Sequence, residues 1–299
     1  MKLFIAALLL SFPAFSQDVM VRTPYGNYRA AWHKVEGGHV AIIIPGSGMV
    51  DRNGNSGNVT GNSLLYLADS LNLHGISTLN TDKLNATPEQ FTSDSILTFD
   101  AFVDLASRWV DVAVDSGYNH ITIIGHSQGA LTALLLGNRP EVDKVISLCG
   151  AGNRIHDILY TQLTAQIPEQ YHEGIASNFD SIRLGYAPKP AHFIMRSMVS
   201  EPNVSFIRSW DSYDPCEAIA ALNGPVLIIS GETDIQVAQS EAERLNECDP
   251  SAELVTIEGM GHMLKRAPSS RALATSYYGR ADLPLHPELA GVIAQFILD

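Results

Sequence analysis

Short apolar runs alternate with segments of helical periodicity along most of this chain. Apolar runs rich in β-branched residues are typical of strands buried in a sheet, and apolar residues spaced three and four apart are typical of helices. The predicted strands are residues 19–22, 28–34, 39–44, 76–79, 121–124, 142–148, 225–230 and 254–257. The predicted helices are residues 64–73, 93–116, 131–136, 238–246 and 289–298. This order predicts an α/β fold, with a mostly parallel central sheet and helices on both faces.

Residues 150–215 interrupt the alternation. This segment is rich in Tyr, Phe, Met and Ile, lacks the pattern of a strand, and is broken by prolines. Because strand–helix order resumes at residues 225–230, we expect a helical cap inserted between two late strands rather than a second domain. Its apolar residues either pack within the cap or line a pocket above a site. The candidates are Ile155, Leu159, Leu163, Phe193, Met195, Met198, Phe206 and Trp210.

The N-terminus has the pattern of a signal peptide. Lys2 precedes an apolar run, and Ala14 and Ser16 supply the small residues that a signal peptidase reads. We expect cleavage after Ser16, so that residues 1–16 are removed and residues 17–299 form one domain. The alternative, a buried first helix, would need a polar face. The apolar run is short for a membrane span, so we expect an exported protein, periplasmic or secreted, without stable membrane insertion after cleavage.

The charge balance narrows the choice of partners. The 299 residues include 19 lysines and arginines against 32 aspartates and glutamates, which gives a net charge of −13. This charge repels nucleic-acid phosphates and anionic lipid surfaces, so we expect neither as a partner. A small neutral or cationic molecule is the expected substrate.

Export would place the three cysteines in an oxidising compartment. Cys149 ends an apolar run and is expected to be a buried free thiol. Cys216 and Cys248 lie in turn-like stretches before predicted strands. They either pair in a disulfide at one edge of the sheet or remain unrelated thiols.

A G-x-S-x-G sequence, Gly125-His126-Ser127-Gln128-Gly129, stands between an apolar strand and a helix. Alone this pattern is common, but the strand–turn–helix context is what a nucleophile elbow requires. The turn is so sharp that the serine takes strained backbone angles, and side chains at the two glycines would clash. Ser127 is therefore the predicted nucleophile.

Two later strand ends provide the partners that a serine hydroxyl needs. Asp234 follows the strand at residues 225–230, and His262 follows the strand at residues 254–257. Both would emerge at the carboxyl edge of the sheet, in the order Ser, Asp, His that this fold uses. Glu232 is the alternative acid. We expect His262 to be the base and Asp234 to orient it.

The oxyanion of a tetrahedral intermediate needs two fixed N–H donors. One is expected to be the backbone N–H of Gln128, at the start of a helix. The other is expected from the loop at residues 45–48, with Ser47 as the best candidate, although a plain glycine turn fits this loop equally well.

Several of these motifs together resemble bacterial serine esterases of the α/β-hydrolase superfamily. The motifs are Gly46-Ser47-Gly48, Asp51-Arg52-Asn53-Gly54-Asn55, Asp82-Lys83, the Gly-His-Ser elbow, Tyr213-Asp214-Pro215 and residues 231–237. The resemblance implies hydrolysis of carboxylic esters, usually with short acyl groups, and no metal or organic cofactor. The chain departs from the pattern after Lys83, where relatives have Arg-Gly, and after Ser127, where many have an acidic residue and paired glycines. Both departures concern the substrate rather than the triad.

Asp51 opens a stretch that superficially resembles a calcium loop. Because Ser56 and Asn62 replace the glycine and glutamate that such a loop needs, we expect no metal ion there. We expect instead that Asp51 organises the loop that carries the oxyanion donor.

Two other functions share these motifs. A serine peptidase or amidase would use the same triad, and a non-catalytic binding protein could keep the scaffold. Loss of a triad residue would mark the second, and all three residues are present.

Overall fold

The computed structural model describes residues 16–84, 97–190, 192–196 and 198–299, and its centre is an eight-stranded sheet. The strands are β1 (Ser16–Thr23), β2 (Gly26–His33), β3 (His39–Ile44), β4 (Ser77–Thr81), β5 (His120–His126), β6 (Lys144–Leu148), β7 (Val226–Gly231) and β8 (Glu253–Ile257). Their order in the sheet is β1-β2-β4-β3-β5-β6-β7-β8. The β1–β2 hairpin and the β2–β4 pair are antiparallel, and all other pairs are parallel. The predicted mostly parallel sheet is confirmed.

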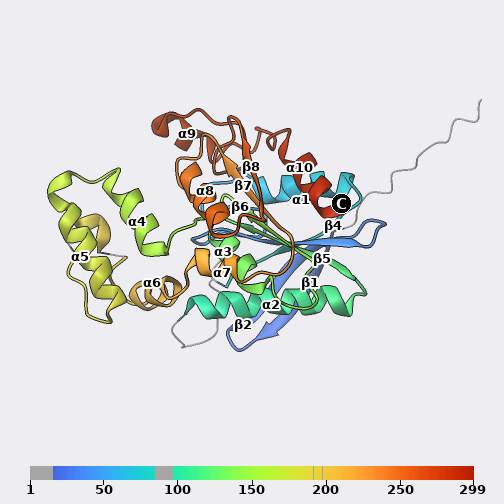
Figure 1. The fold of residues 1–299 in the computed structure, drawn as a ribbon, viewed down its shortest axis with the longest axis horizontal. Helices are drawn as coiled ribbons and strands as arrows, with labels where there is room; N and C mark the ends of the chain where they lie inside the picture. The colour runs from blue at the N-terminus through green and yellow to red at the C-terminus, as the bar shows by residue number, and fades with distance from the viewer. Residues whose placement is uncertain (1–15, 85–96, 191, 197) are drawn as a thin grey trace, which may run out of the picture.

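Helices cover both faces of this sheet (Figure 1). On one face, α1 (Ser63–Leu73) and α10 (Leu289–Leu298) bury their apolar residues in one core cluster. On the other face, a second cluster takes residues from α2 (Phe99–Asp115), α3 (Gln128–Leu136), α7 (Pro215–Ala220) and α8 (Gln239–Cys248). The predicted helix at residues 93–116 begins only at Phe99 among the described residues. A short helix, α9 (Arg271–Tyr277), was not predicted.

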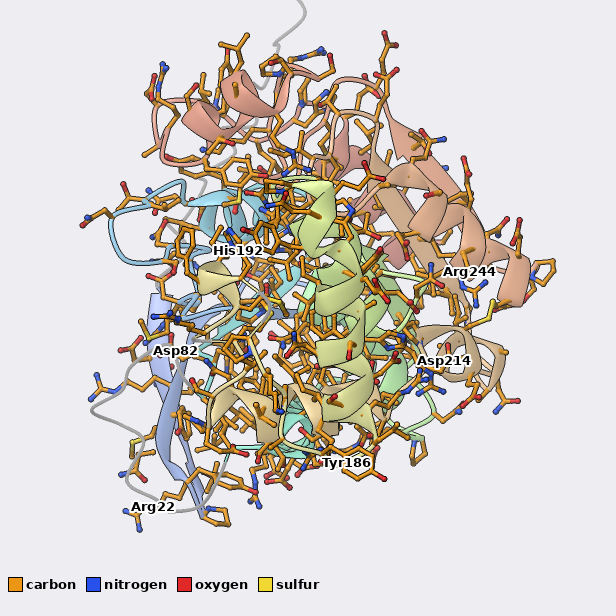
Figure 2. All side chains as sticks on the ribbon, turned by 90° about the vertical axis from the view of Figure 1, so that its left-hand side faces the viewer. Arg22, Asp82, Tyr186, His192, Asp214 and Arg244 are labelled. Carbon is orange, nitrogen blue, oxygen red and sulfur yellow. A yellow bond between two sulfur atoms is a disulfide. The ribbon has the colours of Figure 1, made fainter. Side chains whose placement is uncertain are left out.

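The segment between β6 and α7 forms the helical cap. It contains α4 (Ile155–Thr164), η2 (Glu169–Tyr171), α5 (His172–Arg183), η3 (Phe193–Met195) and α6 (Asn203–Asp211). These elements enclose a small apolar core of their own. Figure 1 shows α4, α5 and α6 projecting to the left of the sheet. In Figure 2, turned so that this side faces the viewer, the cap stands in front of the sheet, between Asp82 on one side and Asp214 on the other.

The cysteines follow one of the two predicted alternatives. Cys216 and Cys248 form a disulfide with their Cα atoms 5.4 Å apart. They lie in α7 and at the end of α8, so the prediction of turn-like positions was wrong. Cys149 is free and buried, as predicted.

The N-terminal prediction falls on residues 1–15, which lie outside the described residues, and on Ser16, where β1 begins. Among the described residues, no helix has the length and apolar character needed to span a membrane.

Candidate active site

Ser127 lies in the sharp turn between β5 and α3. Its φ of 55° and ψ of −116° are strained values for a residue with a side chain. A Cβ on Gly125 would lie 2.0 Å from the carbonyl oxygen of Gly129, and a Cβ on Gly129 would lie 2.5 Å from the carbonyl oxygen of Ile44. The predicted need for glycine on both sides of the serine is thus confirmed by geometry.

Asp234 and His262 meet at the same edge of the sheet, after β7 and β8. His262 Nδ1 lies 2.7 Å from Asp234 Oδ2, and both side chains are buried. Asp234 Oδ1 also accepts the backbone N–H groups of Gln236 and Val237. Burial alone would raise the pKa of the Asp234 carboxyl, but His262 and these N–H donors lower it below its ordinary value. The carboxylate is therefore ionised and able to hold the imidazole in one orientation.

Glu232, the alternative acid, has a different contact. Its Oε2 accepts the backbone N–H of Gly259 at 3.0 Å, at an exposed position. It therefore ties the loop after β7 to the loop after β8, and the geometry favours Asp234 as the partner of His262.

The Asp234–His262 pair is also contacted by His126 and Cys149, two residues for which no role was predicted. His126 Nε2 lies 2.9 Å from the backbone carbonyl oxygen of His262, so His126 anchors the loop that carries the histidine. Burial, with His262 close by, lowers the pKa of His126 to about 3, so its ring is neutral and can donate this bond. Cys149 directly follows β6, and its thiol faces Asp234; burial and that carboxylate raise the pKa of the thiol. The sequence could have pointed to both residues through their position, because each lies at the carboxyl end of a central strand.

Ser47 and Gln128 each present a backbone N–H beside Ser127. Neither N–H has a hydrogen-bond acceptor among the described residues. The loop approaches the serine closely, because a Cβ on Gly46 would lie 3.1 Å from the Ser127 Cβ. Two free donors next to the strained serine are what an oxyanion hole requires.

The stretch after this loop is held by its own polar groups. Asp51 Oδ1 accepts the N–H groups of Asn53 and Asn55, at 2.9 and 2.8 Å. Arg52 forms a bidentate pair with Asp82 at the end of β4. Asp51 thus organises residues 51–55, and its predicted effect on the loop at residues 45–48 stays a prediction.

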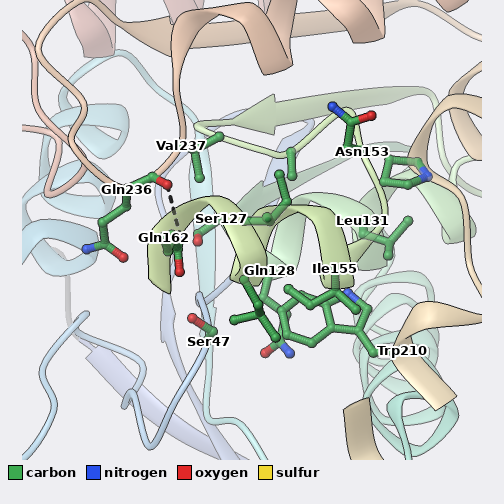
Figure 3. A pocket seen from close by; sticks show the side chains of 14 residues that line it. Ser47, Ser127, Gln128, Leu131, Asn153, Ile155, Gln162, Trp210, Gln236 and Val237 are labelled. Atoms are coloured by element: carbon green, nitrogen blue, oxygen red, sulfur yellow. Dashed lines mark hydrogen bonds between the residues drawn. The ribbon is translucent and has the colours of Figure 1, made fainter. Parts of the chain in front are cut away.

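Two cavities meet at Ser127. The first, about 100 Å³, lies under the cap between Ser127 and Trp210 (Figure 3). Its apolar lining consists of Leu131, Ala151, Ile155, Ile158, Leu159, Trp210, Pro215 and Val237. The second, about 200 Å³, contains His262 and is lined further by Val50, Ser56, Val59, Ser63, Met263 and Tyr278. Ser127, Ser47 and Gln236 border both cavities.

No hydrogen bond joins the Ser127 and His262 side chains among the described atoms, and such bonds are often long before substrate binds.

A family model for α/β hydrolases matches residues 29–269. The chain belongs to the α/β hydrolase family. A comparison with curated protein sequences gives no match.

Solved structures share the fold of this α/β hydrolase. An esterase from Pyrococcus furiosus superposes with a TM-score of 0.60 at 15% identity, covering 100% of this chain and 95% of its own. Est1E from Butyrivibrio proteoclasticus has a TM-score of 0.59 at 16% identity, with 94% and 97% covered. A serine hydrolase from the polyaromatic-hydrocarbon-degrading bacterium Cycloclasticus zankles has a TM-score of 0.59 at 15% identity, with 94% and 98% covered. At these identities the likeness establishes the fold.

Among the described residues, one group of side chains in this hydrolase has ligand atoms close enough to share a metal ion. The atoms belong to His126, Cys149 and His262 and lie within 4.8 Å of one another. Burial and the Asp234 carboxylate raise the pKa of the Cys149 thiol well above its ordinary value, so without a bound metal this thiol is protonated. His262 Nδ1 and His126 Nε2 are also engaged with Asp234 and a backbone carbonyl. These contacts are those of histidines held by hydrogen bonds, and they suit a metal site less well.

Proposed function

We propose that this chain is a serine hydrolase of carboxylic esters, in which Ser127 is the nucleophile, His262 the base and Asp234 the orienting acid. One observation carries the proposal. The buried Asp234–His262 pair opens on the same cavity as a strained Ser127, which is flanked by two unpaired N–H donors. Bound to Asp234 through Nδ1, His262 has Nε2 left to exchange a proton.

The reaction then proceeds in two halves. His262 Nε2 takes the proton of Ser127 as the hydroxyl oxygen attacks the ester carbonyl, and the N–H groups of Ser47 and Gln128 stabilise the oxyanion. His262 next gives this proton to the leaving alcohol, which departs and leaves an acyl-enzyme. A water molecule, deprotonated by His262, releases the acid and regenerates Ser127.

The two cavities suggest how an ester lies in the site. The alcohol must leave within reach of His262, which borders the larger cavity and not the one under the cap. We therefore infer that the alcohol occupies the larger cavity and the acyl group the apolar one. A cavity of about 100 Å³ suits a short acyl chain.

The lining favours an ester over a peptide with a free amino end. No carboxylate lines either cavity among the described residues, so nothing there pairs with a substrate ammonium. Est1E, one of the structural neighbours, has been solved with ferulic acid bound.

Labelling with a fluorophosphonate tests the proposed nucleophile. We expect the wild-type protein to be labelled and to hydrolyse p-nitrophenyl butyrate, and we expect Ser127→Ala to lose both properties. Ser116→Ala, at an exposed serine that lines neither cavity, is the control and should keep them. An unlabelled wild-type protein would contradict both the esterase and the peptidase, and faster cleavage of aminoacyl anilides would favour the peptidase.

We also propose that the protein is exported. The disulfide between Cys216 and Cys248 supports an oxidising compartment. The intact mass of the protein from its native host should correspond to a chain that begins at Gln17. A chain that retains residues 1–16 would contradict this proposal.

A further inference from the structure

Lys83 is a buried lysine beside the proposed oxyanion hole. It lies two residues after the end of β4, and its Nζ donates to the carbonyl oxygens of Gly46 at 2.7 Å and Gly48 at 3.0 Å. The same nitrogen lies 5.1 Å from the centre of the Phe102 ring. Burying an amine is costly, so a lysine kept here is expected to do something that an apolar residue would not.

The two carbonyls that Lys83 holds flank Ser47. The Gly46–Ser47 peptide bond is trans, so its carbonyl and its N–H point in opposite directions. A Gly46 carbonyl fixed on Lys83 therefore turns the Ser47 N–H away from Lys83. Ser47 borders both cavities at Ser127, whereas Lys83 borders neither. Ser47 therefore faces the cavities at Ser127, and Lys83 holds the neighbouring carbonyls from outside them.

Glycine on both sides of Ser47 gives this loop little restraint from side chains of its own. Gly48 has a φ of +83°, in the left-handed region, and a Cβ there would meet no atom within 4 Å. With so little steric restraint, peptides next to glycine rotate easily. A flipped Gly46–Ser47 peptide would aim a carbonyl oxygen, instead of an N–H, at the developing negative charge.

We propose that Lys83 is a positioning residue, which holds the Gly46 and Gly48 carbonyls so that the Ser47 N–H points into the oxyanion hole. This inference rests on the proposed function, because an oxyanion forms only if Ser127 attacks a carbonyl. Lys83 itself does not touch the substrate. Its effect should therefore appear in the transition state and not in substrate binding.

The test is Lys83→Met, which keeps the length of the side chain and removes its donors. We expect kcat for p-nitrophenyl butyrate to fall about 10- to 100-fold, somewhat less than when an oxyanion donor is deleted, while KM changes less than about threefold. A trifluoromethyl ketone with the same acyl chain forms a tetrahedral adduct that uses the same hole. Its inhibition should weaken by the same factor as kcat/KM.

Lys144 provides a matched control. Its Nζ also donates to two backbone carbonyls, those of Phe296 and Ile297, and lies 5.4 Å from a phenylalanine ring. It stands at the start of β6, at the opposite edge of the sheet from Ser127. Lys144→Met should keep the wild-type kcat, even where it lowers the melting temperature as much as Lys83→Met does.

A second pair of variants covers the case in which Lys83→Met does not fold. Gly48 and Gly117 have φ of +83° and +87°, and neither would place a Cβ within 4 Å of another atom. Alanine at either position adds only backbone strain, but Gly48→Ala also shifts a carbonyl that Lys83 holds. We expect kcat to fall several-fold in Gly48→Ala and to stay unchanged in Gly117→Ala.

The outcomes separate the two proposals. If the wild-type protein is active and labelled, a wild-type kcat in folded Lys83→Met overturns the role of Lys83 and leaves the esterase intact. If that variant does not fold, equal kcat values in Gly48→Ala and Gly117→Ala overturn the role of Lys83. A wild-type protein that is neither labelled nor active removes the proposed function first.

Discussion

The loops at the carboxyl edge of the sheet and the cap above them are held in different ways. In the loops, buried polar groups bind backbone atoms, as His126 does at His262 and Lys83 does at Gly46. The cap is held mainly by its own apolar cluster. Its connections to the rest of the molecule include Gln162, which donates to the Gln236 carbonyl, and Trp210, which stacks on Phe99 with ring centres 5.5 Å apart.

The two kinds of interaction suit two different functions. Directional bonds fix atoms to a fraction of an ångström, which the chemistry of a tetrahedral intermediate requires. Apolar packing fixes shape and volume but tolerates changes of residue. The loops should therefore determine the rate of the reaction, and the cap should determine which acyl group is accepted.

The largest effect that would test this division is expected at Asp234. Asp234→Asn keeps the shape but no longer favours the productive tautomer of His262, and we expect kcat to fall about 10⁴-fold. Glu232→Gln is the control, because the hydrogen bond that Glu232 makes among the described residues is to the Gly259 N–H, at an exposed position. Steady-state kinetics with p-nitrophenyl butyrate would measure both. An equal loss in the two variants would contradict the assignment of the acid.

The burial of Lys83, one of the polar groups that hold these loops, should make the stability of the protein depend on pH. Burial lowers the pKa of the Lys83 ammonium from its ordinary 10.5 to about 7. Between these values the unfolded chain binds a proton that the folded chain does not, so the free energy of unfolding rises with pH, by up to about 1.4 kcal/mol per pH unit. The contribution is complete above pH 10.5 and is lost as the pH falls to 7.

Urea unfolding between pH 7 and 10 measures this slope. Lys83→Met removes the titrating group, so the difference in stability between wild type and variant should change with pH in this window. A difference that stays constant with pH would mean that Lys83 is solvated like a surface lysine, and the contrast between loops and cap would weaken.

The sequence was sufficient for the part of the site that depends on strand ends. Each predicted triad residue follows an apolar strand, and a parallel sheet brings the carboxyl ends of its strands to one edge. Asp234 and His262 could thus be placed near Ser127 without knowledge of any contact. The choice between Asp234 and Glu232 needed coordinates, because two residues of loop decide which carboxylate reaches the imidazole.

The role of Lys83 was beyond the sequence for a physical reason. Its bonds to Gly46 and Gly48 exist because β3 and β4 pair in parallel, with Ile43 opposite Asn80. That pairing joins segments almost forty residues apart and leaves no local pattern. The resemblance to known esterases noted the Asp82-Lys83 pair but not what it binds.

The cap shows the same limit more strongly. Of the eight apolar residues considered as pocket lining, Ile155, Leu159 and Trp210 do line the cavity under the cap. Leu163, Met195 and Met198 instead belong to the apolar cluster of the cap or pack against it. Phe193 is 69% exposed. Helical spacing gives the apolar face of a helix, but it does not give the partner toward which that face is turned.

The smallest effect is expected in the cap, at Trp210. This side chain closes one side of the cavity proposed for the acyl group, and among the described residues no hydrogen bond joins it to the loops of the proposed triad. Trp210→Ala should enlarge the cavity, so that the ratio of kcat/KM for p-nitrophenyl octanoate to that for the butyrate rises about 3- to 10-fold. Labelling by a small fluorophosphonate should stay close to the wild-type rate.

Phe193→Ala, at an exposed position of the same cap, is the control and should leave the ratio of the two kcat/KM values unchanged. A fall in labelling rate as large as the change in the ratio would mean that the cap also positions the reacting atoms, and that rate and specificity are not divided between the two regions.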